Sequence, residues 1–578
     1  MRHIVDPRQN RLFDPFSSIF SDVAYRRIRN GWQGVFRHVI LETMPVDALA
    51  GAFHPTMGTP TKELYSMAGL LLIKEFKDWT TTEATEAYLF SADVHYALNL
   101  EPSNQSLCER TVERYETLFV ENDLAAATMD RVTTTLVKAL DLDVSRQRLD
   151  STHVFSDMAI FGRTRMMGVT IQRFLTQLKR HDRALYDALP EALCTRYAPS
   201  PGRMFADTAK NADTRRALRQ DVARQMHWLV ERFADEGSVN GRSTYKTMAK
   251  VFSEQCEVEG ETITVKAHPG NAITQNPADA DATRDGKKGP GYQAQIAETC
   301  SPDNDVQLVT AAIPQTAADD DRDATPAVLD RLEANDRLPE TLYADTHYGA
   351  DASERACAER GVDLQAPVAG TAPVRGPDAL SVDDFVIDEA TEIIERCPAG
   401  HAPISSIHDA ERGRTRTEMP AAACETCPHF DDCPVRRARG KYLLDHTAAD
   451  RRLAARRREQ ETDAFKEHYR IRAGIESTNG SLKRRLGLGR LRCRGRPKVS
   501  HTIYLKLCGW NVLRAADAES LRRRVAEIME KLGHGSHLSP FFAFAVLLSR
   551  LKRRLSARRP LQRTNSIPIA EMGLHLAA

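Results

Sequence analysis

Three acidic residues stand in settings where a carboxylate could do chemistry. Asp150 lies within a short β-like run, Asp345 lies in a second such run, and Glu476 lies in a strongly basic stretch. A carboxylate on a central strand is costly to bury unless it is paired or bound to a cation. If the chain brings the three acids together, their oxygens suit Mg²⁺ or Mn²⁺. Two such ions would activate an attacking water or 3′-hydroxyl and stabilise the leaving oxygen of a phosphodiester.

Each acid also has a simpler interpretation when it is taken alone. Asp150 and Asp345 would be strand-end caps or solvent-exposed side chains. The stretch 469–498 holds ten Lys or Arg residues and one acid. On an exposed helix, Glu476 would then only form an ion pair with Arg472, four residues earlier. The prediction of a metal site therefore requires that all three acids converge.

The elements that must position the acids are the strands of a sheet and a helix packed over it. Asp150 lies in the β-like run 144–155, and a helix is expected at 326–335. Further strands are expected at 292–300, 306–313, 341–348 and 362–368. A hairpin followed by a helix and more strands describes an α/β sheet domain.

The third acid is expected on one face of a helix. Offsets of 0, 3, 7 and 14 residues place side chains on the same helical face. These offsets are those of Tyr469, Arg472, Glu476 and Lys483.

Helical patterns surround the predicted sheet. The region 60–140 reads as a compact helical domain, which is either a helix-turn-helix DNA-binding module or plain packing. We predict an N-terminal helical domain at 1–143, a catalytic domain at 144–515 and a basic helical tail at 516–578. A helical block at about 165–255 and a Cys-rich block at about 391–440 are interpreted as insertions into the catalytic domain.

Composition and charge set limits on the class of protein. The 578 residues are 42% hydrophobic and 28% charged, which is typical of a soluble globular chain. The formal net charge of +1 gives no global argument for nucleic-acid binding. The charge is segregated, however, because 279–285 and 316–323 are acidic whereas 436–498 and 549–563 are basic. This pattern indicates a polyanion partner or ordinary clustering in a long chain.

Two further observations concern the compartment. The N-terminal residues do not follow the pattern of a secretory signal. The longest apolar run, at 538–549, is too short to span a bilayer. We therefore expect a cytoplasmic protein with no membrane partner.

The acidic segments resemble those of the DDE transposases of bacterial insertion sequences. The segment RLDSTHVFSDMA (148–159) resembles the strand of the first Asp, and TLYADTHYGAD (341–351) resembles that of the second. The spacing Tyr469-x2-Arg472-x3-Glu476-x6-Lys483 matches the YREK signature around the catalytic Glu.

The resemblance covers most of the chain. The segment 275–299 resembles the loop and strand pair found between the two Asp strands, and 62–118 resembles the N-terminal domain of the same proteins. The resemblance implies a ribonuclease-H-like sheet domain. It also implies a DNA transposase that catalyses metal-dependent cleavage and strand transfer at the ends of an insertion sequence.

The resemblance further implies roles for individual residues. Asp150, Asp345 and Glu476 would hold the catalytic Mg²⁺ or Mn²⁺. Arg472 and Lys483 would contact DNA phosphate, and Tyr469 would pack against the transposon end. The same basic surface would continue through Arg490, Arg492, Arg494 and Arg496. Because such contacts neutralise phosphates, the binding would depend on salt.

The implied partners are transposon-end DNA and target DNA, with a homo-oligomer formed on the DNA. Two other functions remain open. One is a transposase-derived DNA-binding protein that is no longer catalytic, and the other is a nuclease of the same fold that carries out no strand transfer.

A second candidate metal site is a group of cysteines. Cys424 and Cys427 form a C-x2-C pair, with Cys397 upstream and Cys433 downstream. Four thiolates at such spacing suit a structural tetrahedral Zn²⁺, and His401 and His429 are spare ligands. The alternatives are unligated thiols or a redox pair. The remaining cysteines, such as Cys108 and Cys508, are expected to be buried.

Overall fold

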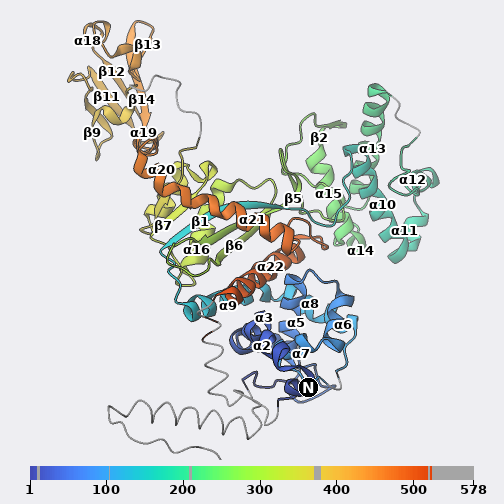
Figure 1. Cartoon of the computed structure of the whole chain (residues 1–578). Coiled ribbons are helices and arrows are strands. Elements are labelled where there is room, and N and C mark those ends of the chain that lie inside the picture. The colour runs from blue at the N-terminus through green and yellow to red at the C-terminus, as the bar shows by residue number, and fades with distance from the viewer. Residues whose placement is uncertain are drawn as a thin grey trace, which may run out of the picture.

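The computed structural model describes residues 1–8, 14–102, 105–206, 211–369, 379–518, 521 and 523. Most of the predicted basic tail, including the apolar run 538–549, lies outside the described residues. Figure 1 shows a central sheet, a group of N-terminal helices on one side of it and a small lobe on the opposite side. A further block of helices lies beside the sheet.

The central sheet is mixed and has six strands in the described residues. They are β1 Arg146–Val154, β4 Thr283–Asp285, β5 Gly289–Thr299, β6 Val309–Thr316, β7 Thr341–Ala344 and β8 Asp363–Gln365. The order is β6-β5-β1-β7-β8, with β4 paired to the beginning of β5. Strand β1 is antiparallel to β5 and parallel to β7, and β7 is parallel to β8. The prediction of an α/β sheet is therefore confirmed.

Helices cover both faces of this sheet. Helices α16 (Thr325–Glu333) and α17 (Asp351–Ala358) pack on the face that carries Leu149. Neighbouring side chains of a strand point to opposite faces. Arg148 and Asp150 therefore point to the other face, where α21 (Gly474–Arg485) contacts β1.

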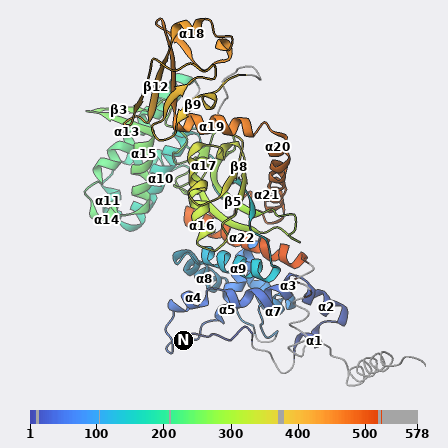
Figure 2. The ribbon, with the colours of Figure 1, turned by 90° about the vertical axis from the view of Figure 1, so that its left-hand side faces the viewer.

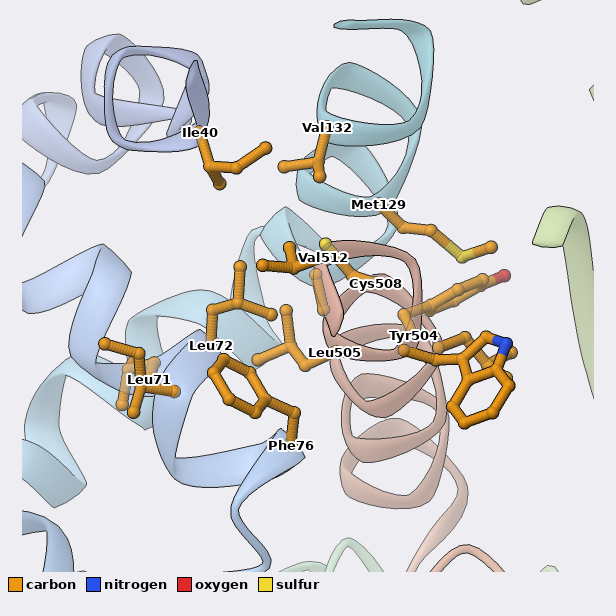
Figure 3. Packing of buried hydrophobic residues seen from close by; sticks show 14 of the residues in the cluster. Ile40, Leu71, Leu72, Phe76, Met129, Val132, Tyr504, Leu505, Cys508 and Val512 are labelled. Carbon is orange, nitrogen blue, oxygen red and sulfur yellow. The ribbon is translucent and has the colours of Figure 1, made fainter. Parts of the chain in front are cut away.

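Apart from a small separate cluster of Phe16, Ile28 and Tyr96, the N-terminal helices share their hydrophobic core with the sheet. They are α1 Phe16–Ile19, α2 Asp22–Asn30, α3 Trp32–Val35, α4 Val46–Gly51, α5 Leu64–Phe76, α6 Thr81–Phe90, α7 Ala92–Ala97, α8 Glu109–Glu121 and α9 Leu124–Leu140. Helix α22 (Arg496–Asp517) packs against α5, α9 and β6. Figure 3 shows Leu505 and Cys508 of α22 among side chains of α5 and α9. Helix α22 is buried nearly all round, including its polar residues Lys506 and Asn511, and lies at the centre of this packing.

Two local features explain the N-terminal helical pattern. Thr80 caps α6 and forms a reciprocal capping box with Glu83, as its sequence pattern predicts. Helix α5 is buried on almost all sides, which agrees with its dense run of Leu residues. Helices α1–α4 fall in a region without a regular apolar period, so the sequence pattern did not predict them.

The helical block beside the sheet has a core of its own. It contains α10 Arg163–His181, α11 Arg183–Asp187, α12 Glu191–Arg196, α13 Ala212–Arg232, α14 Gly237–Asn240 and α15 Ser243–Gln255. The hairpin of β2 (Cys256–Glu259) and β3 (Thr262–Val265) follows it. Buried side chains of α10, α13 and α15 form a cluster separate from the core of the sheet.

The Cys-rich lobe is built on short strands. They are β9 Val386–Asp388, β10 Ile393–Arg396, β11 Ser405–Asp409, β12 Arg414–Met419, β13 Arg436–Ala438 and β14 Lys441–Thr447, with α18 at Ala421–Glu425. The strands β11-β12-β14-β13 form one sheet and β9 pairs with β10. Figure 2 shows α19 (Ala448–Glu459) and α20 (Asp463–Tyr469) leading from this lobe back to α21.

Two predicted elements differ from the structure. The strand expected at 341–348 ends at Ala344, because the Asp345 carboxylate accepts a hydrogen bond from the His347 amide and begins a 3-10 turn. The stretch from Tyr469 to Lys483 is not one α-helix, since a 3-10 helix at Arg470–Ala473 separates α20 from α21. The tighter turn changes the angular spacing on which the single-face prediction rested. Among the described residues, no helix combines the length and apolarity needed to cross a bilayer.

Candidate active site

A single guanidinium reaches all three predicted acids. Arg472 Nη1 lies 2.7 Å from Glu476 Oε1, and Nη2 lies 3.1 Å from Asp150 Oδ1. The same Nη2 lies 3.8 Å from Asp345 Oδ2. The structure thus brings Asp150, Asp345 and Glu476 around one positive charge, although they come from three distant segments.

Asp150 is the most enclosed of the three acids. Its side chain is 14% exposed, against 27% for Asp345 and 65% for Glu476. Asn479 of α21 donates a hydrogen bond from Nδ2 to Asp150 Oδ2 at 3.0 Å. Burial raises the pKa of Asp150, and the attraction of Arg472 only partly offsets this rise. A buried carboxylate with a raised pKa next to a second acid is typical of a functional site.

The segment before α21 contacts the end of β7, where Asp345 begins. Tyr469 donates a hydrogen bond from its hydroxyl to the Ala344 carbonyl at 3.1 Å. Its ring stacks on Phe465, with centroids 5.5 Å apart. Tyr469 is therefore half-buried and connects the segment that carries Arg472 to the strand end that carries Asp345.

The predicted arginines of the basic surface lie next to the end of β1. The Phe155 amide donates to the Gly489 carbonyl and the Leu491 amide donates to the Phe155 carbonyl. Residues 489–491 therefore pair with Phe155, the residue that follows β1. Exposed and more buried residues alternate here, and the exposed ones are Arg490, Arg492, Arg494 and Arg496.

Two of these arginines already have acidic partners. Arg492 Nη2 lies 3.1 Å from Asp78 Oδ2, and Arg494 Nη2 lies 2.7 Å from Asp157 Oδ2. Both guanidinium groups remain about half exposed, so these are surface ion pairs of small stabilising value. Lys483 is exposed in the last turn of α21.

The acids suit a hard divalent cation by their chemistry, but the guanidinium lies among them. Their donor set is oxygen only, which is what Mg²⁺ prefers. The ligand atoms of Asp150, Asp345 and Glu476 do not all lie within 4.8 Å of one another. In the described chain, the group of possible metal ligands that does meet this distance is Glu75, Glu116 and His501. A divalent ion shared by the three acids would therefore require Arg472 to move.

The group formed by Glu75, Glu116 and His501 already contains a cation. Lys74 Nζ lies 2.9 Å from Glu75 Oε1 and 3.0 Å from Glu116 Oε1. A second lysine, Lys506, places its Nζ 4.0 Å from Glu75 Oε2. The carboxylates are thus paired with lysines, and we assign no metal to them.

The four predicted cysteines line one small cavity. This cavity of about 20 Å³ has room for one ion, and His401 and His429 also line it. Its cysteines are Cys397, Cys424, Cys427 and Cys433. Burial and then the three neighbouring thiols raise the pKa of Cys424 to about 11. Thiol ligands suit a thiophilic cation by their chemistry. As with the acids, no three of these ligand atoms lie within 4.8 Å of one another in the described chain, so a bound cation would require the side chains to close around it.

The other cysteines divide between buried and exposed positions. All eleven cysteines lie in the described residues, and no disulfide joins any of them. Cys508 is buried as predicted. The same prediction is wrong for Cys108, which is exposed as the residue before α8.

Comparison with known proteins adds one finding. Residues 396–516 match the family model of a transposase DDE domain. This match confirms the resemblance to DDE transposases, and it covers most of the Cys-rich lobe, Glu476 and nearly all of α22. The segments that carry Asp150 and Asp345 precede the matched region. Searches of curated proteins and of solved structures gave no match.

Sequence reasoning missed one polar neighbour of Asp150 and one of Ser151, the next residue. Asn479 lies one helical turn beyond Glu476, so helical periodicity could have identified it as a neighbour. Lys288, in the turn between β4 and β5, approaches the Ser151 hydroxyl at 3.4 Å. No sequence signal pairs Lys288 with β1, because the contact depends on the register of β5.

Proposed function

We propose that this protein is a DNA transposase that cleaves and joins DNA at the ends of an insertion sequence with divalent metal ions. The observation that carries the proposal is the contact of Arg472 with Asp150, Asp345 and Glu476. A shared counter-ion supports a common site for acids that the chain separates by hundreds of residues. The match of residues 396–516 to a transposase DDE domain supports the same reaction class.

The three acids are proposed to hold Mg²⁺ or Mn²⁺. When bound, these ions activate the attacking hydroxyl and stabilise the leaving oxygen of the phosphodiester. Asn479 orients the Asp150 carboxylate by its hydrogen bond. Arg472 neutralises the acids before metal binding and is free to pair with a DNA phosphate once it is displaced.

The basic surface is proposed to contact the DNA backbone. Arg490 and Arg496 are exposed, and the ion pairs of Arg492 and Arg494 are surface pairs that phosphate can replace. Lys483 in the last turn of α21 and Tyr469 at the end of α20 are proposed to belong to the same DNA-binding surface. Contacts with transposon ends and target DNA would release counter-ions, so the affinity should fall with increasing salt.

The sheet order supports a ribonuclease-H-like fold for the catalytic domain. Three antiparallel strands followed by two parallel ones, in the order β6-β5-β1-β7-β8, support this assignment. The block α10–α15 and the Cys-rich lobe are proposed as insertions, and the lobe is proposed to hold a structural Zn²⁺. Assembly of a homo-oligomer on DNA is part of the same proposal.

The test uses a duplex from the DNA that directly flanks the coding region. The Asp345→Asn protein should bind this duplex as the unmodified protein does and lose Mg²⁺-dependent cleavage. Loss of cleavage should exceed about a hundredfold, because each metal contact is worth several kcal/mol. Retention of cleavage would contradict the catalytic assignment. A joining assay with the cleaved ends separates strand transfer from simple nuclease activity.

A further inference from the structure

A buried ion pair lies beneath the acids. Arg148 and Glu298 face each other on β1 and β5, and both are buried. Glu298 Oε2 accepts from Arg148 Nε at 2.8 Å and lies 2.7 Å from Nη2. Such a pair is costly to bury unless its remaining donors and acceptors are also satisfied.

The remaining groups of this pair bind the segment that carries Arg472 and Glu476. Arg148 Nη1 donates to the Ile471 carbonyl at 3.1 Å. Glu298 Oε1 accepts from the Thr478 hydroxyl at 2.8 Å. The ion pair therefore contacts this segment just before Arg472 and just after Glu476.

Gly474 shows how closely the segment approaches the ion pair. A Cβ atom built at Gly474 would lie 1.8 Å from Arg148 Nη1. The helix backbone thus rests directly against the guanidinium, and a side chain here would force one of them to move. Gly474 has ordinary helical dihedral angles, so the close approach and not the backbone conformation requires glycine.

Arg148 also precedes Asp150 by two residues on the same strand. Residues two apart on a strand share a face, so the anchor of α21 and the most enclosed acid project from one rigid element. Any shift of α21 against Arg148 would change the positions of Glu476 and Asn479 relative to Asp150.

We propose that Arg148, Glu298 and Thr478 are positioning residues that set the distance between Asp150 and the acid of α21. This inference rests on the proposed metal-dependent function. None of the three touches the reacting atoms in this arrangement. Their effect on the reaction comes from the placement of Glu476, for which an error of about 1 Å can cost a hundredfold in rate.

The Thr478→Val variant is the sharpest test, because it removes the hydroxyl and keeps the shape of the side chain. We expect cleavage of the flanking duplex to slow about tenfold. Mn²⁺ binding, measured by calorimetry without DNA, should weaken in parallel, and DNA affinity in Ca²⁺ should stay within about twofold. Thr478→Ser should restore both quantities because it returns the hydroxyl.

Two further variants make the result independent of general damage. Thr170→Val removes a buried hydroxyl of α10 that bonds the Met166 carbonyl, and it should change neither Mn²⁺ binding nor cleavage. Glu298→Gln keeps the shape of the anchor and weakens its charge, so it should act like Thr478→Val if the latter fails to fold. The Asp345→Asn protein serves as a reference in the Mn²⁺ calorimetry, because the binding that this variant loses is the binding at the acids.

The outcomes separate the two proposals. If the unmodified protein cleaves and binds Mn²⁺ but Thr478→Val and Glu298→Gln match it in both assays, the positioning role is wrong and the proposed function stands. The proposed function fails if the unmodified protein does not cleave DNA and Asp345→Asn does not change its Mn²⁺ binding. The positioning role then fails with it.

Discussion

The two candidate metal sites are assembled in opposite ways. The acids come from β1, the end of β7 and α21, and Asn479 contacts Asp150 across 329 residues of sequence. The cysteines lie within 397–433 and line one cavity. Arg472 offsets part of the charge of the acids, whereas the cysteines share their cavity with two histidines and several apolar side chains.

This difference indicates what each metal would replace. A cation at the acids must displace an internal guanidinium, which offsets part of their negative charge before metal binds. A cation at the cysteines must displace protons, because thiols bind metal as thiolates. The acid site is therefore expected to depend on metal for catalysis, and the lobe is expected to depend on metal for its fold.

The packing of the lobe supports this contrast. Its core consists of a few side chains, among them Phe385, Met419, Tyr442 and Leu444, with three of the cysteines packed against it. The core shared by the N-terminal helices and the sheet is far larger. Small units with a limited apolar core usually need a disulfide or a metal for stability.

The largest effect is expected for the Cys424→Ser/Cys427→Ser double variant. It should lose the bound zinc and the order of the lobe, because structural zinc can contribute on the order of 10 kcal/mol to a small fold. The measurements are zinc content by mass spectrometry and limited proteolysis within 379–447. Cys108→Ser is the matched control, since Cys108 is exposed and far from the cavity in sequence.

Zinc loss should also depend on pH. Because protons compete for the thiolates, a chelator should remove zinc faster at lower pH. An unmodified protein that contains no zinc and resists proteolysis in the lobe would contradict the comparison between the two sites.

A smaller and opposite pair of effects is expected for Arg472→Met. The variant should bind Mn²⁺ about tenfold more tightly, equivalent to ~1.4 kcal/mol, because the competing cation is gone. Cleavage should nevertheless fall, because the guanidinium proposed to pair with phosphate is lost. Calorimetry without DNA and a cleavage assay measure the two effects separately.

Arg470→Met is the matched control for this prediction. Arg470 is exposed and pairs with Glu467, so its loss should leave Mn²⁺ affinity unchanged. Weaker Mn²⁺ binding by Arg472→Met would mean that the guanidinium organises the acids and does not compete with the metal.

A third prediction concerns the amide that orients Asp150. Asn479→Ala removes the hydrogen bond from Nδ2 and should weaken Mn²⁺ binding about fivefold, the value of one net hydrogen bond. Asn335→Ala, which removes an amide bonded to the Arg331 carbonyl, should have no such effect. Equal Mn²⁺ affinity in both variants would mean that Asn479 is not needed to orient Asp150.

The sequence predicted the strands and the acids better than it predicted their connections. Alternation in β5 and the Thr80–Glu83 pattern have local causes, so the strand and the capping box could be read directly. The break between α20 and α21 could not, because it accompanies the contacts of Tyr469 with Ala344 and of Arg148 with Ile471.

The same reasoning separates the two candidate sites. The cysteines lie close in sequence, and the structure places them around one cavity. The shared contact of Arg472 with three acids depends on strand order and on the register of β1 against β7, neither of which a single sequence supplies. The spacing also predicted the ion pair of Arg472 with Glu476, which the structure contains, but it did not indicate that Arg472 would contact Asp150 and Asp345 as well.

The smallest effect expected is a gain in stability at the acid site. Burial raises the pKa of Asp150, which means that the folded protein disfavours the ionised form relative to the unfolded chain. Above the raised pKa the carboxylate is ionised in both states, so Asp150→Asn should there raise the melting temperature slightly while it abolishes cleavage. As pH falls through the raised pKa, the carboxylate is protonated and the difference should disappear.

The surroundings of Asp150 can accept the new amide. Asn479 Oδ1 is buried and has no hydrogen-bond partner among the described residues, so the Asn479 amide can turn over and accept a hydrogen bond from the substituted side chain. Arg472 keeps its bond to the remaining oxygen. Melting temperatures of both proteins at neutral and acidic pH measure the effect. A lower melting temperature for Asp150→Asn at neutral pH would show that attraction to Arg472 outweighs the cost of burial. In that case the acids would depend on their counter-ion for stability, as the cysteines are expected to depend on zinc.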